Sequence, residues 1–375
     1  MNLIKYFTII LVIAVFVSCG KNSDSSVGVN NTISIDLVDS KSKDQLGLNI
    51  IDLKPIRMDS AFKGFSQRLR VKKIDGWYFV FDLEFQQLYC IDSAGNFKYD
   101  VGGLGSGPNE LSGVLDFTYL DGQISFLIQA GDRTKIAQFD TLGNEMFRAE
   151  IDYPVSAFEQ FGHNEYLLYT GWSNKATPYR LHKWDIQTGE DTLIFPHDHS
   201  EEKMPMEAYS LMKNDKGILF FDPLTPFVHQ INSGLSISPS ITFDLGKYRL
   251  DDDYWDLSVD EAIEALFGNG FYSCTYFVRS ENYLAMLGTF VDEGGSEQER
   301  TLSIYNYKSN TIATRVLQPG TLDELALNVF SVEDKQMISL GDGYVLRQVD
   351  EGADLLERYK VSGDDYYLVY AEVGM

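Results

Sequence analysis

Two polar segments of this 375-residue chain contain side chains of the kinds that bind metal ions. The first is His197-Asp198-His199, which is followed by Glu201 and Glu202. A His-x-His pair in a loop needs a third ligand from another part of the chain to hold zinc, and the sequence identifies none. We therefore expect a solvated polar loop here rather than a metal site.

The second segment is the run Asp251–Asp253. Clustered carboxylates are ligands that calcium prefers, but the regular alternation and the glycine of a calcium-binding loop are missing. Ser258 and Glu261 instead have the spacing of a helix capping box, and Gly268 can end the helix that they begin. The sequence predicts a short helix over residues 259–267 rather than a calcium loop.

Residues 102–107 are rich in glycine, as phosphate-binding loops are. Such loops lead from a strand into a helix and usually carry a lysine, whereas this one joins two predicted strands and has no lysine. We expect a structural turn in which Pro108 fixes the exit of the chain. Glu110 is the ionisable side chain of the loop, and it either caps loop amides or faces a central channel.

Three aromatic residues fall in long connections that also contain many carboxylates: Trp172, Tyr254 and Trp255. Ring faces stack on the apolar faces of sugars, and carboxylates accept hydrogen bonds from hydroxyl or ammonium groups. Together with Glu110, these residues are the predicted binding set for a carbohydrate or for a peptide with basic groups. The alternative is that the rings pack an inserted helix against the rest of the fold.

The elements that must position these residues belong to one repeated unit. A strand rich in apolar and aromatic residues, a turn that begins with Asp or Asn, and a second strand recur, and the anchors of the turns are Asp92, Asp140, Asp185, Asn232 and Asn306. The intervals between these anchors are 48, 45, 47 and 74 residues, so the last interval carries an insertion. Self-similarity at about 45 residues is typical of the four-stranded blade of a β-propeller.

The chain is therefore predicted to be all-β, a six-bladed β-propeller with short helical insertions and a single domain over residues 32–375. Five blades follow from the repeats, and residues 336–373 fit a sixth blade that lacks an outer strand. A propeller closes when the two chain ends share a blade, because an unpaired edge strand exposes backbone hydrogen-bonding groups. We expect the N-terminal segment to supply the missing strand, from Ile51–Met58 or from Ile33–Leu37.

The long connections of this propeller are all predicted on one face. If each blade runs from an inner strand a to an outer strand d, the links from d to the next a and from b to c emerge together. The long links are residues 102–113, 171–178, 196–207, 245–271, 291–300, 318–327 and 350–361. Loops carry binding function more often than tight turns, so this loop-rich face is the predicted recognition surface, with a ligand at the mouth of the channel.

Residues 1–18 have the features of an export signal, with Lys5 near the start and an unbroken apolar run over Ile9–Val17. This run is shorter than the roughly 20 apolar residues of a membrane-spanning helix. Cys19 follows directly, which predicts that this cysteine is lipidated and anchors the protein in the cell envelope, at the outer membrane, through a flexible tether over residues 19–31. The alternative is cleavage nearby that leaves Cys19 unmodified.

The composition limits the partners. The chain has 31 basic and 55 acidic residues and a formal net charge of −24, so nucleic acid is not an expected partner, and membrane attachment would rest on the lipid. The two remaining cysteines, Cys90 and Cys274, fall in strands of different predicted blades. We expect two buried free thiols rather than a disulfide.

One part of the sequence resembles a known family. The segment Val101–Leu111 contains Gly-x-Gly-Pro-x-Glu and follows the turn that runs from Asp92 to Gly95. Together with the ending Gly363–Tyr370, it resembles the exported six-bladed β-propeller lipoproteins of Bacteroidetes, which are TolB-like and NHL-like. The resemblance implies the fold, the lipid anchor and an envelope location, and it brings no catalytic residues.

We expect a monomeric, lipid-anchored binding module for a glycan, a peptide or an envelope protein, without catalytic residues, metal or cofactor. The alternative is a calcium-dependent hydrolase of the lactonase type, in which inward carboxylates hold the ion as a Lewis acid. Glu110 and Asp116 are the ligands that the sequence offers for this ion. A third hypothesis, a scaffold for partner proteins, predicts a broad exposed apolar patch.

Overall fold

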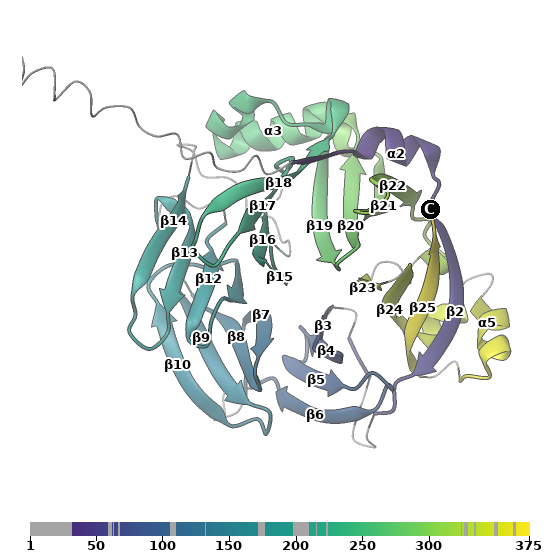
Figure 1. Cartoon of the computed structure of the whole chain (residues 1–375), viewed down its shortest axis with the longest axis horizontal. Coiled ribbons are helices and arrows are strands. Elements are labelled where there is room, and N and C mark those ends of the chain that lie inside the picture. The colour runs from purple at the N-terminus through teal and green to yellow at the C-terminus, as the bar shows by residue number, and fades with distance from the viewer. Residues whose placement is uncertain are drawn as a thin grey trace, which may run out of the picture. The chain divides into compact units, whose positions relative to one another are not determined.

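Six small sheets stand in a ring in the computed structural model of the chain (Figure 1). The structure describes residues 32–375 except for 59–61, 63, 67, 106–109, 132, 172–176, 198–209, 215, 223, 324, 326–328, 334, 349–351 and 363–364. Five sheets have four strands each and one has five, and residues 33–375 form one compact unit. The predicted all-β, six-bladed propeller is confirmed.

The strands of the first three blades follow one another along the chain. Blade 1 consists of β3 (Leu69–Ile74), β4 (Trp77–Asp82), β5 (Gln87–Ile91) and β6 (Phe97–Gly102). Blade 2 consists of β7 (Val114–Leu120), β8 (Gln123–Ala130), β9 (Arg133–Asp140) and β10 (Glu145–Ile151). Blade 3 consists of β11 (Ala157–Gln160), β12 (Glu165–Tyr169), β13 (Tyr179–Asp185) and β14 (Asp191–Pro196).

The other three blades continue this order, with N-terminal additions to two of them. Blade 4 consists of β15 (Leu211–Asn214), β16 (Gly217–Phe221), β17 (Phe227–Ile231) and β18 (Ile237–Asp244). Blade 5 consists of β19 (Phe271–Arg279), β20 (Tyr283–Val291), β21 (Gln298–Asn306) and β22 (Thr311–Val316). Blade 6 consists of β23 (Val329–Glu333), β24 (Gln336–Asp342), β25 (Tyr366–Gly374) and β2 (Gly47–Pro55).

The repeated turn anchors are local hydrogen-bonding devices between the third and fourth strands. Asp92 Oδ1 accepts hydrogen bonds from the backbone N–H groups of Ala94 and Asn96, both at 2.9 Å. Asp140 makes the same pair of bonds two and four residues ahead, and Asp185, Asn232 and Asn306 each bind two backbone N–H groups in their own turns. A side chain that binds its own backbone in this way fixes a turn without help from the rest of the fold.

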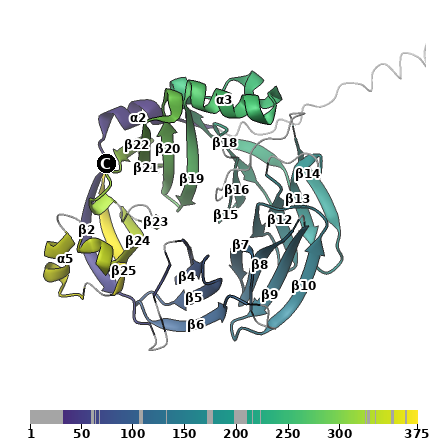
Figure 2. The same ribbon diagram turned by 180° about the vertical axis from the view of Figure 1, so that it is seen from behind.

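The N-terminal segment closes blade 6, as predicted. β2 pairs antiparallel with β25 as the outer strand, and it overlaps the first of the two stretches that were expected to do so. The second stretch has another partner, because β1 (Ile33–Asp36) pairs in parallel with β18 and makes blade 4 five-stranded. Between them, α2 (Leu37–Lys43) packs against β18 and β22, so this segment crosses blades 4, 5 and 6 (Figures 1 and 2).

The 74-residue interval of the repeat contains a helical insertion between blades 4 and 5. It consists of η1 (Gly246–Tyr248), η2 (Asp252–Asp256) and α3 (Val259–Asn269). The capping box of Ser258 and Glu261 is present, and α3 ends at Gly270 rather than at Gly268 because Gly270, at φ 74°, adopts the positive φ that ends it. Shorter helical pieces lie between the second and third strands of blades 5 and 6: η3 (Glu293–Gly295) in blade 5, and α4 (Gly343–Leu346) and α5 (Gly352–Tyr359) in blade 6.

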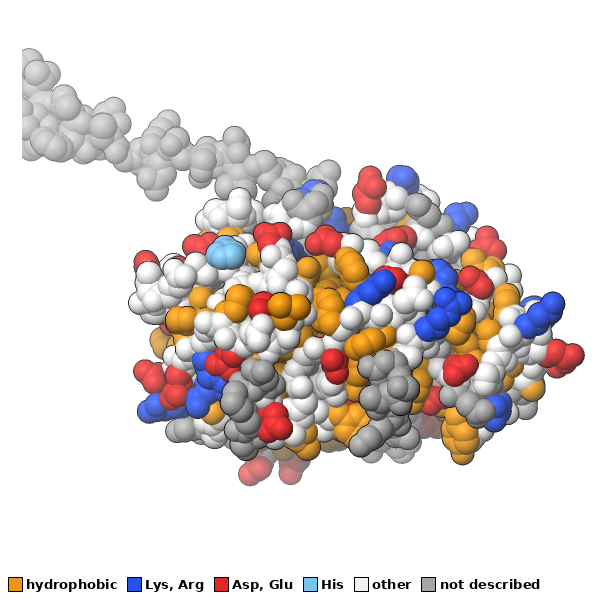
Figure 3. Space-filling view, turned by 90° about the horizontal axis from the view of Figure 1, so that it is seen from below, with side chains coloured by type: hydrophobic (Ala, Val, Ile, Leu, Met, Phe, Trp, Pro, Cys, Tyr) orange, Lys and Arg blue, Asp and Glu red, His pale blue; other side chains and the backbone are white. Residues whose placement is uncertain are grey.

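The apolar core is divided among the boundaries between blades. Phe81 of blade 1, for example, packs its ring against Phe117 and Phe126 of blade 2 at centroid distances of 5.8 and 5.7 Å. Cys90 and Cys274 are buried in different blades as free thiols, as predicted. No helix in the described part of the chain is long and apolar enough to span a membrane. From the side, hydrophobic and charged side chains are interspersed over the surface (Figure 3).

Candidate functional site

The long connections leave the propeller at one face, because each joins strand b to strand c of a blade or strand d to the next blade. The insertion of η1, η2 and α3 links blade 4 to blade 5, and α4 and α5 link the second and third strands of blade 6. Short turns connect the strands at the opposite face, as at Asp75-Gly76 and Asp121-Gly122. The loop-rich face expected from the sequence is therefore present.

A buried ion pair lies at this face on the boundary between blades 3 and 4. It joins the guanidinium of Arg180, near the start of β13, to the carboxylate of Asp222, which directly follows β16. The two side chains are 4% and 2% exposed. Tyr169 donates a hydrogen bond from its hydroxyl to Asp222 Oδ1 at 2.6 Å, and burial, together with this carboxylate, raises the pKa of Tyr169 well above its ordinary value. The hydroxyl therefore keeps its proton and acts as a donor.

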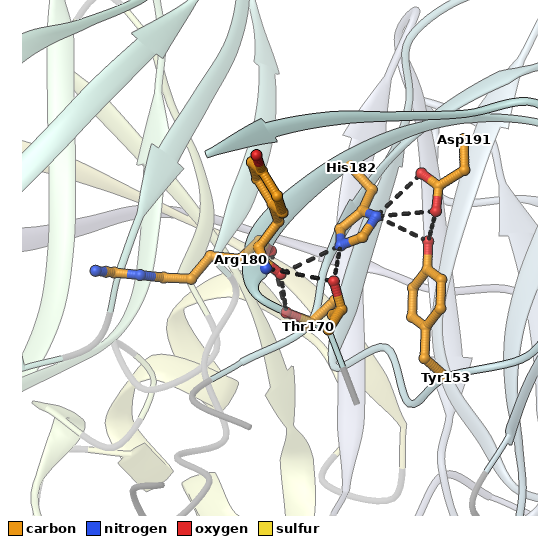
Figure 4. Close-up of polar contacts among 7 residues, drawn as sticks. Tyr153, Thr170, Arg180, His182 and Asp191 are labelled. Atoms are coloured by element: carbon orange, nitrogen blue, oxygen red, sulfur yellow. Dashed lines mark hydrogen bonds and ion pairs between the residues drawn. The ribbon is translucent and has the colours of Figure 1, made fainter. Parts of the chain in front are cut away.

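An irregularity in β13 aims Arg180 at blade 4. Residues two apart on a regular strand share a face, but the pairing of β13 with β14 shifts twice between Tyr179 and His182. Arg180 consequently contacts Asp222 in blade 4, whereas His182 contacts Tyr153 in the link between blades 2 and 3. Figure 4 shows the Arg180 side chain extending away from the group around His182.

A cavity of about 420 Å³ lies beside this ion pair, between blades 3 and 4 and the insertion. We call it the blade 3–blade 4 cavity. Its rings come from β14, β17 and η2, and its polar side chains come from both blades and the insertion: Phe195, Phe227, His229 and Trp255, with Arg180, Asp222, Thr225, Arg249, Asp252 and Asp256. The cavity thus combines half-buried aromatic surface with charged groups of both signs.

His229 joins the aromatic wall of this cavity. Its ring centroid is 5.7 Å from that of Phe195 and 6.2 Å from that of Phe227. Burial and the charge of Arg180 lower the pKa of His229 to about 4, so the imidazole is neutral at pH 7. Its Nδ1 atom is buried and has no hydrogen-bond partner among the described residues.

His182 belongs to a separate polar group in blade 3 (Figure 4). Its Nδ1 lies 3.0 Å from both carboxylate oxygens of Asp191, and its Nε2 lies 3.1 Å from Thr177 Oγ1 and 3.1 Å from the Tyr179 carbonyl oxygen. Thr177, His182 and Asp191 therefore have the order of a nucleophile, a base and its orienting acid. However, Nε2 lies as close to the Tyr179 carbonyl oxygen as to the Thr177 hydroxyl, and Thr177 is only 7% exposed. These contacts tie the link before β13 to β14 and, through Tyr153, to the link between blades 2 and 3.

Asp116, one of the two carboxylates considered for calcium, lies on the inner strand β7. Its Oδ1 is 3.3 Å from Arg70 Nη1 and 3.3 Å from Lys72 Nζ, both on β3. A calcium ion at this carboxylate would stand beside two cations, so the surroundings of Asp116 do not fit the ion. In the described part of the chain, no group of three or more His, Cys, Asp or Glu side chains could hold a metal.

Glu159 is a buried carboxylate on β11, the inner strand of the next blade. It accepts hydrogen bonds from the Thr118 hydroxyl and from the Gln160 N–H, the latter at 3.0 Å. Burial raises the pKa of Glu159 above its ordinary value, although Lys72 and the Thr118 hydrogen bond act in the opposite direction. The inner strands of blades 1 to 3 thus hold interacting charged side chains that are already paired with one another.

The four predicted ligand-binding residues are not brought together. Trp255 lines the blade 3–blade 4 cavity, whereas Tyr254 is buried in the apolar cluster that packs the insertion against β19 and β20. Glu110 is exposed, and its carboxylate lies against Gly105 of the same loop, where an added methyl group would meet Oε2 at 2.0 Å. Trp172 lies outside the described residues, as does Cys19.

The described residues of the two segments considered for metal binding do not belong to any cluster of metal ligands. Asp251–Asp253 are exposed at the start of η2, and the helix α3 follows them as predicted. His197 is half-buried at the end of blade 3. Residues 198–209, which include the rest of the His-x-His segment and both glutamates after it, lie outside the described residues.

The sequence interpretation missed Arg180, Asp222 and His229. A weak signal existed for Asp222, because an Asp also ends or follows the second strand of three other blades, as Asp82, Asp292 and Asp342. Asp82, for instance, accepts hydrogen bonds from the backbone N–H groups of Glu84 and Phe85 in the next link. A strand-end Asp was therefore a second repeated feature of this sequence.

Solved structures resemble this propeller over most of its length. A protein of Bacteroides fragilis NCTC 9343, described as exported, is 14% identical with a TM-score of 0.67, and the match covers 92% of this chain and all of that chain (100%). A member of the DUF4221 family from Bacteroides vulgatus ATCC 8482 is 12% identical with a TM-score of 0.55, covering 88% of this chain and 98% of that one. At these identities the likeness concerns the fold. No curated protein matches the sequence.

One family model matches most of the chain. It is the model described as a domain of unknown function (DUF4934), and it matches residues 59–354. This range begins after the closing strand β2 and ends within α5, so it includes both walls of the blade 3–blade 4 cavity and the insertion. The chain belongs to the DUF4934 family.

Proposed function

We propose that this protein is an exported, lipid-anchored binding protein that holds a small ligand in the blade 3–blade 4 cavity. Cys19 carries the lipid, residues 20–31 form the tether, and the propeller acts at the outer membrane as a monomer without a cofactor. The resemblance to TolB-like and NHL-like propeller lipoproteins supports the export and the anchor, and the B. fragilis neighbour, which is described as an exported protein, supports the export.

The observation that carries the binding proposal is the construction of the cavity. Ligand pockets are concave and mostly apolar, with a few polar groups whose positions are fixed. The blade 3–blade 4 cavity has half-buried rings from two blades and the insertion. Beside them lies a buried ion pair whose carboxylate also accepts a hydrogen bond from Tyr169. The cavity also lies at the face that carries the long connections, where side chains from the third and fourth strands of blade 3 and the third strand of blade 4 line it.

The enzymatic alternative has less support from the side chains. Asp116 is paired with Arg70 and Lys72, and the Thr177 hydroxyl beside His182 is buried. Neither the calcium-dependent hydrolase nor a nucleophilic hydrolase therefore gains support from these two groups. The scaffold hypothesis gains little from Figure 3, where apolar side chains form small groups among charged ones on the side that is drawn.

The test is the thermal unfolding of the purified protein with a panel of glycans and short peptides, each measured with calcium and with a chelator. A ligand of the native state raises the unfolding midpoint. We expect one class of ligand to raise it equally with calcium and with chelator, and Trp255→Ala to abolish the rise. A rise that requires calcium would favour the hydrolase and contradict the proposal, and so would a rise that Trp255→Ala leaves unchanged.

A further inference from the structure

We infer that the ligand of the blade 3–blade 4 cavity is an uncharged carbohydrate of one or two pyranose rings. This inference rests on the proposed function, because it names the ligand class for the same cavity. Three properties of the lining carry it: the rings, the balance of charge, and one buried nitrogen atom.

The rings provide flat apolar surface in the form that sugars use. Phe195, His229 and Phe227 form a continuous wall from β14 and β17, with successive centroids 5.7 and 6.2 Å apart. Trp255 adds an indole from η2, a separate element. A pyranose ring has C–H groups on its faces and hydroxyl groups around its edge, so it can stack on such rings while its edge meets polar groups. A cavity of about 420 Å³ has room for one or two such rings.

The charges of the lining disfavour a ligand with a strong charge of its own. Two basic and three acidic side chains line the cavity: Arg180, Arg249, Asp222, Asp252 and Asp256. The charge of Arg180 is neutralised by Asp222, and at the rim Arg249 Nη2 lies 3.5 Å from Asp252 Oδ1. A carboxylate or phosphate ligand would meet the acidic rim, and the best-buried carboxylate already has two partners that a cationic ligand would have to displace. Hydroxyl groups suit both signs, because they donate to carboxylates and accept from guanidinium groups.

The buried Nδ1 atom of His229 favours a ligand that carries a hydroxyl group. This atom has no hydrogen-bond partner among the described residues, and the ring to which it belongs lines the cavity. Because the pKa of His229 is about 4, the ring is neutral at pH 7, and Nδ1 is either a donor or an acceptor depending on the tautomer. A hydroxyl group satisfies either tautomer, whereas an ammonium group satisfies only one and a carboxylate only the other.

The experiment is isothermal titration of the purified protein at pH 7 with three sets of probes. They are neutral disaccharides built from glucose, galactose, mannose or N-acetylglucosamine; disaccharides that contain a uronic acid; and dipeptides that contain lysine. We expect binding from the neutral set. Trp255→Ala should weaken it at least about tenfold, and His229→Phe, which keeps a ring but removes the nitrogen, should weaken it by roughly five- to tenfold.

Tyr344→Ala is the matched control, because Tyr344 is 63% exposed in α4 at the same face and does not line this cavity. It should leave the affinity unchanged, and the unfolding midpoint of each variant shows whether it is folded. If uronates or lysine dipeptides bind and Trp255→Ala abolishes that binding, the inference of a neutral sugar is wrong, but the cavity remains the binding site. Binding that Trp255→Ala and His229→Phe leave intact, or no binding by any set, would overturn the sugar and count against the cavity itself.

Discussion

Arg180 and Asp222 come from different blades, 42 residues apart, and form an ion pair whose side chains are almost completely buried. Removing one partner of such a pair leaves the other charge without compensation in a medium where charge is costly. Asp222→Ala should therefore lower the free energy of unfolding by about 3–5 kcal/mol. Chemical denaturation measures this change. Glu150→Ala, which breaks the exposed pair with Arg133, is the control and should have little effect; an equally small effect of Asp222→Ala would contradict the account.

Glu159 should make the protein less stable as the pH rises. Its pKa is raised in the folded state, so the stabilisation is complete below the ordinary value of 4.5 and is lost as the pH rises through the folded-state pKa. Glu159→Gln stays neutral and should remove this decline. The measurement is the free energy of unfolding between pH 4 and pH 8 for both proteins, and parallel curves would show that Glu159 is not the group responsible.

His229 should have its effect in the acid range, with the opposite sign. Its pKa is lowered from 6.5 to about 4, so the unfolded chain takes up a proton before the folded protein does. Stability is then lost as the pH falls from 6.5 towards 4, by up to about 3 kcal/mol. His229→Phe should remove this loss, which denaturation at pH 7 and at pH 4.5 would detect. Because Glu159 acts with the opposite sign over the same range, the test is the difference between the two proteins, and an equal change in both between pH 4.5 and pH 7 would argue against a neutral, half-buried imidazole.

The closing strand should be essential to the ring. Leu53 in β2 is 3% exposed and packs against Leu325, Tyr367 and their neighbours, so Leu53→Ala should cost about 2–5 kcal/mol. Ile51→Ala, in the same strand but 36% exposed, is the matched control and should cost much less. Equal costs in thermal denaturation would mean that β2 adds little to blade 6.

Cys19 should carry the lipid anchor. Cells grown with an alkyne-labelled fatty acid should incorporate the label into the wild-type protein, which should partition into a detergent phase. Cys19→Ala should lose both properties while the propeller folds normally, because no described core residue is altered. A wild-type protein without label would favour the alternative of cleavage near an unmodified cysteine.

The features that could be predicted from the sequence are those that local chemistry fixes. The turn anchors Asp92 and Asp140 bind backbone groups only two and four residues away, so their spacing directly indicates the blades. The capping box of α3 is also local, and its start was predicted correctly, whereas its end was placed two residues early because Gly268 and Gly270 look alike in sequence.

The site could not be predicted because its geometry depends on contacts between blades. Regular alternation would place Arg180 and His182 on the same side of β13, and only the irregular pairing with β14 separates them. The ion pairs of Asp116 could not be predicted for the same reason. Its sequence position suggests a free inward carboxylate, whereas Arg70 and Lys72 contact it from a neighbouring blade. Which cation meets which carboxylate is decided by blade packing, and no local pattern records it.

The path of the N-terminal segment also determines how the propeller would bear a mechanical load. Residues 33–55 cross three blades, and β1, with four paired residues, precedes α2 and the longer strand β2. A pull on the chain before Ile33 would reach β1 first, and this short ladder could detach from blade 4 while β2 continued to close the ring. If Cys19 carries the lipid, as proposed, the segment would then act as an extensible lead between the anchor and the cavity, lengthening under tension without opening the propeller.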